Sequence, residues 1–249
     1  MAPSSNVVLI TGASRGIGAA AAIAAARNGF DVAVNYLKDE AAAQRVVQAI
    51  SQSGRKAVAI QGDVGKAEDI PRIFKQAEAS LGPLTALVNN TGITGPIGAF
   101  SKTSDDTIER VFQVNVFGTI QCSRAALTSF ARHGTTGVIV NVSSVAARTG
   151  SPNEYIHYAA SKAAVETFTL GLAREVAAAG IRVCAVAPGS TLTEIHATAG
   201  EPGRPARVAP KIPMGRLARP EEVAETIVWL LSPAASYITG TVVQCAGGL

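Results

Sequence analysis

The residues best suited to chemistry in this 249-residue chain are a tyrosine and a lysine, Tyr158 and Lys162. They stand four positions apart near the start of a predicted helix, so they share one helical face. A tyrosine with an ordinary pKa near 10 is a poor base at neutral pH. To act as a base there, its pKa must be lower by about 3 units, which corresponds to stabilising the phenolate by roughly 4 kcal/mol. Because a neighbouring ammonium shifts the pKa in that direction, the pair predicts a phenol that exchanges a proton with a substrate.

A hydroxyl group suited to holding a substrate oxygen precedes this pair. Ser144 follows the apolar run Val138–Val142, which is predicted to be a buried strand, and its hydroxyl can hydrogen-bond a carbonyl oxygen. His157 directly precedes Tyr158 and is interpreted as a residue of the pocket rim. Substrate contact by His157 or by His196 is the less favoured alternative.

The first turn of the chain is expected to bind an anion. Val7–Ile10 is typical of a buried strand, and a helix is predicted over residues 19–26. Three glycines lie between them, Gly12, Gly16 and Gly18. Without side chains they let a phosphate approach the backbone, where the first N–H groups of a helix are unpaired. The GxxxGxG spacing differs from the common GxGxxG fingerprint and from a Walker loop, so glycines that serve only packing are the alternative.

Short apolar runs alternate with helix-forming stretches along the whole chain. The predicted strands are 7–10, 31–36, 57–60, 86–89, 138–142, 182–186 and 241–243, and the predicted helices are 19–26, 39–53, 67–81, 104–133, 155–179 and 220–231. This order predicts an α/β fold, with a doubly wound parallel sheet covered by helices on both faces. We expect one domain over 1–249, with a dinucleotide-binding half at about 1–140 and a catalytic half at about 141–249.

The end of the second predicted strand bears on the choice of cofactor. An NAD-binding chain usually has an acid about 18 residues after the last glycine, to bind the ribose 2′-hydroxyl. That position is Tyr36 here, and the next acid is Asp39. Arg15 and Lys38 can instead pair with a 2′-phosphate, so the sequence favours NADP (NADPH), with NAD less favoured. The alternative is that both cations are merely solvated.

Ligands of open parallel sheets bind beyond the carboxyl ends of the strands, and small or polar residues follow every predicted strand. Asp63 is the candidate contact to the adenine. The remaining cofactor-binding candidates are Ser14, Ile17, Val64, Asn90, Gly92, Pro188, Gly189, Thr191 and Thr193.

Composition excludes several other classes of function. The formal net charge is +4, but the 22 basic residues are scattered, which argues against nucleic-acid binding. Hydrophobic residues make up 47% and charged residues 16%, as expected for a sizeable core and for surface buried in a homo-oligomer. The three cysteines lack metal-ligand spacing, and no run reaches the ~18 apolar residues of a membrane span. With no leader in residues 1–6, we expect a soluble, cytoplasmic protein without a metal.

Taken together, these residues resemble the short-chain dehydrogenase/reductase family over nearly the whole chain. The matching motifs are Thr11 to Gly18, Asn89 to Gly92, Asn115, Ser143 with Ser144, Tyr158 with Lys162, and Pro188 with Gly189 and Thr193. The resemblance implies a Rossmann-like domain of seven parallel strands, commonly a homotetramer. It also implies hydride transfer between a nicotinamide cofactor and a small-molecule carbonyl or alcohol substrate.

The same resemblance implies a role for each matching residue. Tyr158 is the acid/base, Lys162 lowers its pKa and binds the nicotinamide ribose, and Ser144 orients the carbonyl. Asn115 holds a water in the proton relay, unless it is only a satisfied helix asparagine. The chain departs from the family at Thr91, where alanine is usual. Ser144 and Tyr158 are also fourteen positions apart, against an expected spacing of about thirteen, so the intervening loop is expected to bulge.

The segment 190–215 is rich in proline and glycine and is expected to be an irregular lid over the site. Its cations Arg204, Arg207 and Lys211 are interpreted as solvated, with an anionic substrate as the alternative.

The function that the sequence favours is an NADP-dependent carbonyl reductase or alcohol dehydrogenase. A 3-oxoacyl-carrier-protein reductase is a narrower alternative, but residues 177–180 offer no charge for docking a carrier protein. A regulator that binds NADP without turnover is the alternative from another class, although such a sensor does not need all of Ser144, Tyr158 and Lys162.

Overall fold

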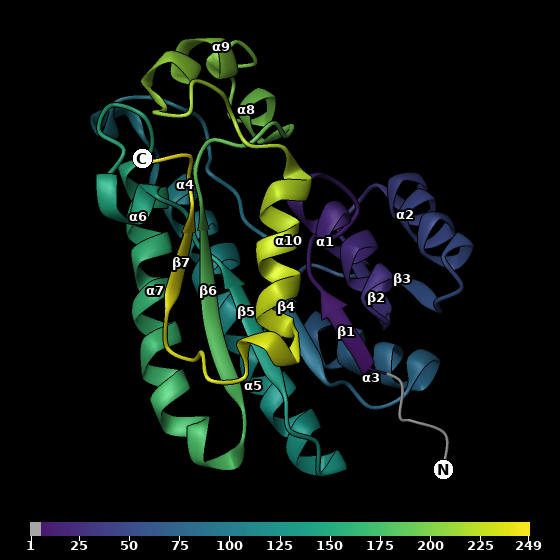
Figure 1. Ribbon diagram of the computed structural model, residues 1–249. Coiled ribbons are helices and arrows are strands. Elements are labelled where there is room, and N and C mark those ends of the chain that lie inside the picture. Colours follow the sequence, from purple (N-terminus) through teal and green to yellow (C-terminus); the bar gives the residue numbers. More distant parts are fainter. Residues whose placement is uncertain (1–5) are drawn as a thin grey trace.

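The computed structural model describes residues 6–249 as a seven-stranded sheet in the order β3-β2-β1-β4-β5-β6-β7 (Figure 1). Every pair of neighbouring strands is parallel, which confirms the predicted α/β fold. The strands are β1 (Asn6–Ile10), β2 (Phe30–Tyr36), β3 (Ala57–Gln61), β4 (Ala86–Asn89), β5 (Val138–Val142), β6 (Arg182–Pro188) and β7 (Val242–Cys245). The order reverses between β1 and β4, and such a switch is where open α/β sheets bind their ligands.

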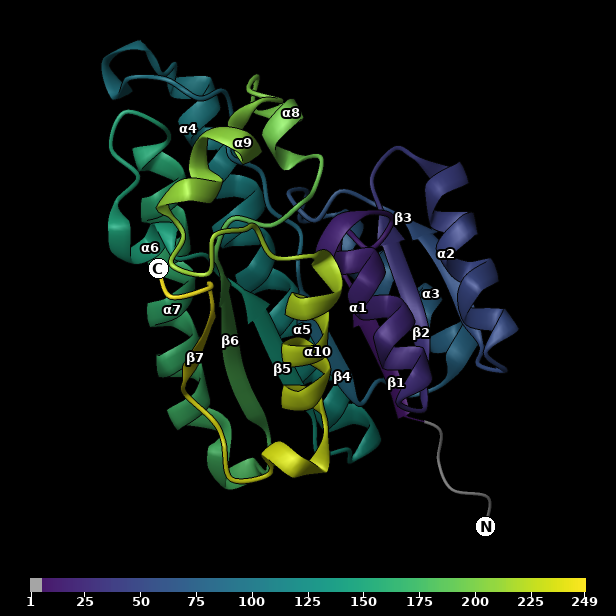
Figure 2. The same cartoon turned by 45° about the horizontal axis from the view of Figure 1, so that its top comes forward.

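Helices cover both faces of the sheet (Figures 1 and 2). The helices are α1 (Gly16–Arg27), α2 (Glu40–Gln52), α3 (Asp69–Leu81), α4 (Asp105–Phe112), α5 (Gly118–His133), α6 (Ala146–Thr149), α7 (Ile156–Val176), α8 (Ile195–Thr198), α9 (Arg204–Val208) and α10 (Pro220–Leu231). Helices α1, α2 and α10 share one core with Val8 and Ile10 of β1, whereas α3, α5 and α7 share the other with Val7 and Leu9. Both faces of the central strands β1, β2, β4, β5 and β6 are buried, which is why these strands appear in the sequence as mainly apolar runs.

The helix predicted over 104–133 is interrupted in the structure. One π-helical turn, Gln113–Phe117, joins α4 to α5 and carries Asn115. A π turn holds one residue more than an α turn and is frequent at functional sites. Hydrophobic periodicity does not reveal a single extra residue, so the sequence predicted one continuous helix.

Two loops lie over the carboxyl ends of the strands. The segment between Ser144 and Tyr158 contains the single turn α6, followed by left-handed backbone at Gly150, Ser151 and Asn153 with φ of 72°, 43° and 61°. The segment 190–215 holds only the short helices α8 and α9 and a 3₁₀ turn, as its composition predicted. Figure 2 shows α8 and α9 above the ends of the strands, beside the start of α7.

Within residues 6–249, no helix has the length and hydropathy needed to cross a membrane, and no acidic, histidine or cysteine residues group as metal ligands. Cys122 and Cys184 are buried and Cys245 is half-buried, all as free thiols. The expectation that the chain has no leader falls largely on residues 1–5, outside the described part.

Candidate active site

Helix α7 places Tyr158 and Lys162 side by side in a buried position. Tyr158 is 8% exposed and Lys162 is 3% exposed. The Lys162 Nζ lies 5.7 Å from the centre of the Tyr158 ring and donates a hydrogen bond to the carbonyl oxygen of Val142 at 2.7 Å. The ammonium is therefore anchored at the end of β5, beside the phenol.

The two serines after β5 face different surroundings. Ser143 is buried and donates to the Glu166 carboxylate at 2.9 Å. Ser144 is half-buried, and its oxygen accepts a hydrogen bond from the Ala146 N–H at 3.1 Å. The Ser144 hydroxyl can thus donate its proton, to Tyr158 or to a substrate oxygen, so the second serine is the one suited to hold that oxygen.

The electrostatics of the pair differ from the sequence-based prediction. Burial raises the pKa of Tyr158, while a hydrogen bond with Ser144 and the positive charge of Arg204 act in the opposite direction. Burial outweighs both effects in this structure, and the lowering of this pKa by Lys162 beside a bound nicotinamide stays a prediction. Burial also lowers the pKa of Lys162, to about 8, because the ammonium is costly to bury.

Asn115 is fixed by the loop that follows β4. Its Nδ2 donates to the Ile93 carbonyl at 2.9 Å and to the Ser161 hydroxyl at 3.0 Å, and its Oδ1 accepts from the Ile93 N–H at 2.9 Å. All of its side-chain groups thus have protein partners. Its amide thus positions the loop against α7, and its role in holding a water stays a prediction.

The glycine-rich turn between β1 and α1 adopts a backbone that side chains would block. Gly12 and Gly16 have φ of 61° and 56°, in the left-handed region. A Cβ on Gly18 would lie 2.4 Å from the Gly12 carbonyl oxygen and 2.5 Å from the Asn90 Nδ2. Ser14 and Ile17 are half-buried in the same turn.

Buried polar side chains hold this turn in place. Asn90 Nδ2 donates to the carbonyls of Thr11 and Gly12 at 2.9 and 3.1 Å. Asn35 Oδ1 accepts from the Gly12 N–H at 3.3 Å, and the Thr11 hydroxyl oxygen accepts from the N–H of Asn90 at 3.0 Å. The amide of Asn90 thus supports the turn from behind.

Predicted cofactor residues from distant parts of the sequence meet around the turn. A Cβ placed on Gly16 would lie 3.2 Å from the Thr193 methyl. A Cβ placed on Gly92 would lie 3.1 Å from the Lys162 Nζ. Gly189 packs on the end of β7, where its Cβ would lie 2.9 Å from the Ala246 Cα. A cradle without side chains, leading to a buried tyrosine and lysine, fits a dinucleotide whose nicotinamide end reaches Tyr158.

The remaining cofactor candidates make contacts that the sequence did not indicate. Asp63 pairs with Arg110 at 2.7 Å and accepts the Gly65 N–H at 2.9 Å. Val64 is buried beneath α5, and Pro188 ends β6. Thr191 is buried, and its carbonyl oxygen lies 2.9 Å from His196 Nε2.

The ribose end carries the two predicted cations on its surface. Lys38 is exposed, and Arg15 forms an exposed ion pair with Glu194 at 2.6 Å. Tyr36 is buried at the end of β2. The nearest acid, Asp39, caps α2 by accepting the Ala42 N–H at 2.9 Å, so its carboxylate is already engaged.

Two interpretations of the lid and pocket rim are corrected by the structure. Arg204 is 8% exposed and is therefore not solvated, whereas Arg207 is exposed as expected but pairs with two carboxylates. His157 and His196 are 3% and 6% exposed, so His157 is not at a pocket rim. His157 Nε2 lies 2.8 Å from the Thr94 carbonyl. Sequence reasoning missed the carboxylate that organises the lid, Glu154, because ion pairs between segments fifty residues apart leave no local pattern.

Known proteins are similar to this chain over its whole length. The family model described as enoyl-(acyl carrier protein) reductase matches residues 12–249. An uncharacterized oxidoreductase, YgfF, from Escherichia coli K12 is 48% identical over 97% of this chain and 99% of its own. An L-rhamnose 1-dehydrogenase (NAD(P)(+)) from Sphingomonas sp. SKA58 is 38% identical over 98% and 96%. The crystal structure of a short-chain type dehydrogenase/reductase from Mycobacterium marinum superposes with a TM-score of 0.92, at 34% identity over 98% of this chain and 95% of that one.

Together with the parallel sheet and the tyrosine–lysine site, these similarities assign the chain to the short-chain dehydrogenase/reductase family. Within that family it is an oxidoreductase, of the type that uses NAD(P).

Proposed function

We propose that this protein is an NADP-dependent oxidoreductase that interconverts a ketone or aldehyde and the corresponding alcohol. The observation that carries the proposal is the buried Tyr158, with the Ser144 hydroxyl and the Lys162 ammonium beside it and the glycine-rich cradle in front of them. Bound NADPH would supply the hydride.

The side chains divide the remaining work of carbonyl reduction. Ser144, whose oxygen already accepts from Ala146, donates its proton in a hydrogen bond to the substrate carbonyl. Tyr158 then gives its phenolic proton to the same oxygen as negative charge develops there. The raised pKa of Tyr158 keeps the phenol neutral at physiological pH, which is the state that reduction requires. Lys162 has N–H groups beyond the one bound to Val142, and these face Gly92, where they hold the ribose.

A substrate panel tests this function. We expect the protein to oxidise NADPH with some members of a set of small aldehydes and ketones, and to reduce NADP with the corresponding alcohols. L-rhamnose is added to the panel because a similar protein is named for that sugar. A 3-oxoacyl thioester in the same panel tests the narrower carrier-protein reductase. NADPH binding without turnover on any member would instead support a sensor and contradict the proposal.

The cofactor preference rests on Arg15 and Lys38. An exposed ion pair such as Arg15–Glu194 is weak, so a 2′-phosphate can displace the carboxylate. We expect the double variant Arg15→Ala/Lys38→Ala to bind NADPH about tenfold to a hundredfold more weakly, with NADH binding changed about twofold at most. Fluorescence titration at low salt measures both. The control is Arg27→Ala, an exposed cation at the far end of α1. Equal affinity of the parent protein for NADPH and NADH contradicts this preference.

We also propose that the protein is a cytoplasmic homotetramer. Large hydrophobic side chains are exposed on the surface that residues 6–249 form, among them Phe117, Leu170 and Trp229. Leu170 lies on α7 and Trp229 on α10, so two separate surfaces are available for association. Light scattering at micromolar concentration is expected to give the mass of four chains. A monomer mass under those conditions contradicts the proposal.

A further inference from the structure

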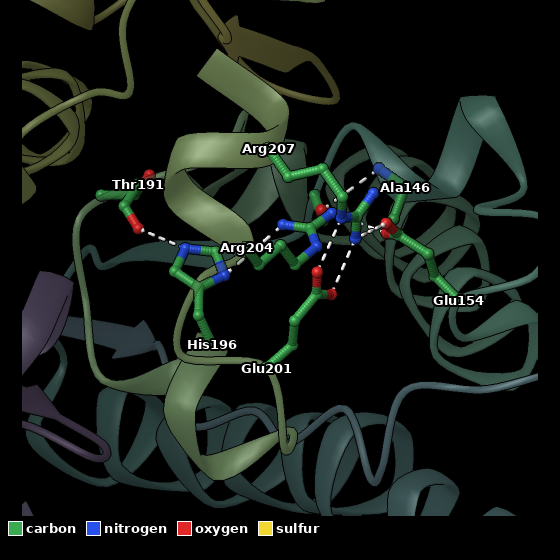
Figure 3. Close-up of polar contacts among 8 residues, drawn as sticks. Ala146, Glu154, Thr191, His196, Glu201, Arg204 and Arg207 are labelled. Carbon is green, nitrogen blue, oxygen red and sulfur yellow. Dashed lines mark hydrogen bonds and ion pairs between the residues drawn. The ribbon is translucent and has the colours of Figure 1, made fainter.

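The lid holds a buried cation, Arg204, among the polar contacts drawn in Figure 3. Arg204, the first residue of α9, has a side chain that is only 10% exposed. Its Nη2 donates to the Glu154 carboxylate at 2.7 Å, and Glu154 lies just before α7. A buried ion pair thus joins the lid to the segment that begins the catalytic helix.

The Arg204 guanidinium lies over the ring of Tyr155, the residue just before α7. Its central carbon lies 5.4 Å from the centre of the Tyr155 ring, within the range of a cation–π interaction. The Tyr155 ring meets the Tyr158 ring edge-on, with 5.2 Å between their centres and 85° between their planes. Contacts therefore run without a break from the lid cation through the Tyr155 ring to the Tyr158 ring.

Glu154 does not fully neutralise this cation. Its other oxygen accepts from Arg207 at 2.8 Å, so one carboxylate is shared by two guanidinium groups. Glu201 compensates the second of these, because both of its oxygens bind Arg207. The Arg204 Nε is buried and has no hydrogen-bond partner among residues 6–249. Part of the Arg204 charge is thus left to act on the rings.

His196 contacts Arg204 without adding charge (Figure 3). Its Nδ1 lies 3.4 Å from Arg204 Nη1 and its Nε2 lies 2.9 Å from the Thr191 carbonyl oxygen. Because a guanidinium only donates and a carbonyl only accepts, Nδ1 is the acceptor and Nε2 carries the proton. Burial lowers the pKa of His196, which favours this neutral form.

Few other groups that titrate or carry charge face Tyr158. Lys162 lies on the same helix as Tyr158, and Tyr155 lies just before that helix. Glu154 interacts with Tyr155 and Arg204, which lie between its carboxylate and Tyr158. The neighbouring elements contribute apolar side chains, namely Val111 of α4, Ala146 of α6, and Ile93 and Ile97 of the loop after β4. Arg204 is therefore the cation that approaches the phenol from outside α7.

We propose that Arg204 is a positioning residue for proton transfer: carried by the lid and anchored by Glu154, it stabilises the negative charge that Tyr158 acquires. The inference rests on the proposed role of Tyr158 as the acid/base. The charge of Arg204 acts to lower the pKa of Tyr158 against the effect of burial, which is the direction the proposal requires.

Two matched variants test the proposal. Arg204→Met removes the stacked charge, and Glu154 keeps Arg207 as its partner. Arg207→Met removes an equal positive charge from the same helix and removes one of the two cations that pair with Glu154. It leaves the Arg204 guanidinium paired with Glu154 and over the Tyr155 ring. The first measurement needs no substrate: the absorbance of tyrosinate is titrated with pH, and the same titration of each protein carrying Tyr158→Phe is subtracted. The second is the pH profile of kcat for alcohol oxidation, with the best substrate of the panel.

Arg204→Met is expected to raise the ionisation midpoint of Tyr158 and the apparent pKa of kcat by about one unit, so that kcat below that pKa falls about tenfold. Arg207→Met is expected to leave both midpoints in place, and Arg204→Lys is expected to bring them most of the way back to the parent values.

Equal midpoints in Arg204→Met and the parent protein, or equal shifts in Arg204→Met and Arg207→Met, overturn the proposal. If Tyr158→Phe keeps its activity, the proposed function fails as well, whereas a missing Arg204 shift alone leaves that function standing. Should Arg204→Met not fold, Arg204→Gln, which removes the charge but keeps an amide that can donate to Glu154, decides the question by the same midpoints.

Discussion

Tyr158→Phe is expected to lower kcat by about 10²–10⁴-fold, the range that general acid–base catalysis contributes. The substitution removes one oxygen and keeps the ring that packs against Tyr155 and the surrounding apolar side chains. Without the phenolic proton, the alkoxide formed in carbonyl reduction has no donor in the wall of the site. Ser144 alone can hold the oxygen but is far too weak an acid to replace the phenol.

Steady-state kinetics with NADPH and a fluorescence titration of NADPH binding separate chemistry from binding. We expect kcat to fall while the Kd for NADPH changes about twofold at most, because the glycine-rich turn is untouched. Tyr237→Phe, which removes the same oxygen from an exposed side chain, is the control and should keep its activity. A Tyr158→Phe enzyme with the kcat of the parent would remove the phenol from the mechanism.

Much of the fold could be predicted from the sequence because its signals are local. Strands β4 and β5 and helix α10 have the predicted bounds, since apolar runs and helix-starting residues such as Pro220 act within one element. The glycines of the first turn were equally clear, because left-handed backbone and close approach both require glycine there.

The parts that the sequence did not reveal depend on contacts across the fold. The π turn at Asn115 follows from hydrogen bonds to Ile93 and Ser161, which come from two other segments. Arg204 was interpreted as solvated because arginines in loops usually are, and only the folded chain brings Glu154 to it. The raised pKa of Tyr158 likewise depends on burial, which no spacing of tyrosine and lysine expresses.

The second large effect is expected for Lys162→Met, which should be less active and more stable. Removing the ammonium takes away the proposed donor to the cofactor ribose and a positive charge beside the phenol, and we expect kcat/KM to fall by about 10²-fold or more. Methionine fills a similar volume without a charge to bury. NADPH oxidation at saturating carbonyl substrate measures the loss.

The stability change follows from the pKa of Lys162, about 8 in the folded protein against 10.5 as the ordinary value. Below pH 8 the lysine is charged in both states, and burying that charge costs about 3 kcal/mol of unfolding free energy. Between pH 8 and 10.5 the unfolded chain binds more protons, so this cost disappears as the pH rises. Loss of the hydrogen bond to Val142 lowers the free energy of unfolding by about 1 kcal/mol. The free energy of unfolding of Lys162→Met should therefore exceed that of the parent by about 2 kcal/mol at pH 7.

Denaturant unfolding of parent and variant at several pH values measures this gain. The difference in unfolding free energy between the two proteins should be largest near neutral pH and shrink through the window from pH 8 to 10.5. Taking the difference removes the contributions of the buried tyrosines, which both proteins share. Lys75→Met, at an exposed position of α3, should show no such pH-dependent gain. A Lys162→Met protein that is less stable than the parent at pH 7 would mean that more contacts than the Val142 carbonyl stabilise the ammonium. Greater stability together with lost activity would show that the lysine is retained for its chemistry at a cost in folding stability.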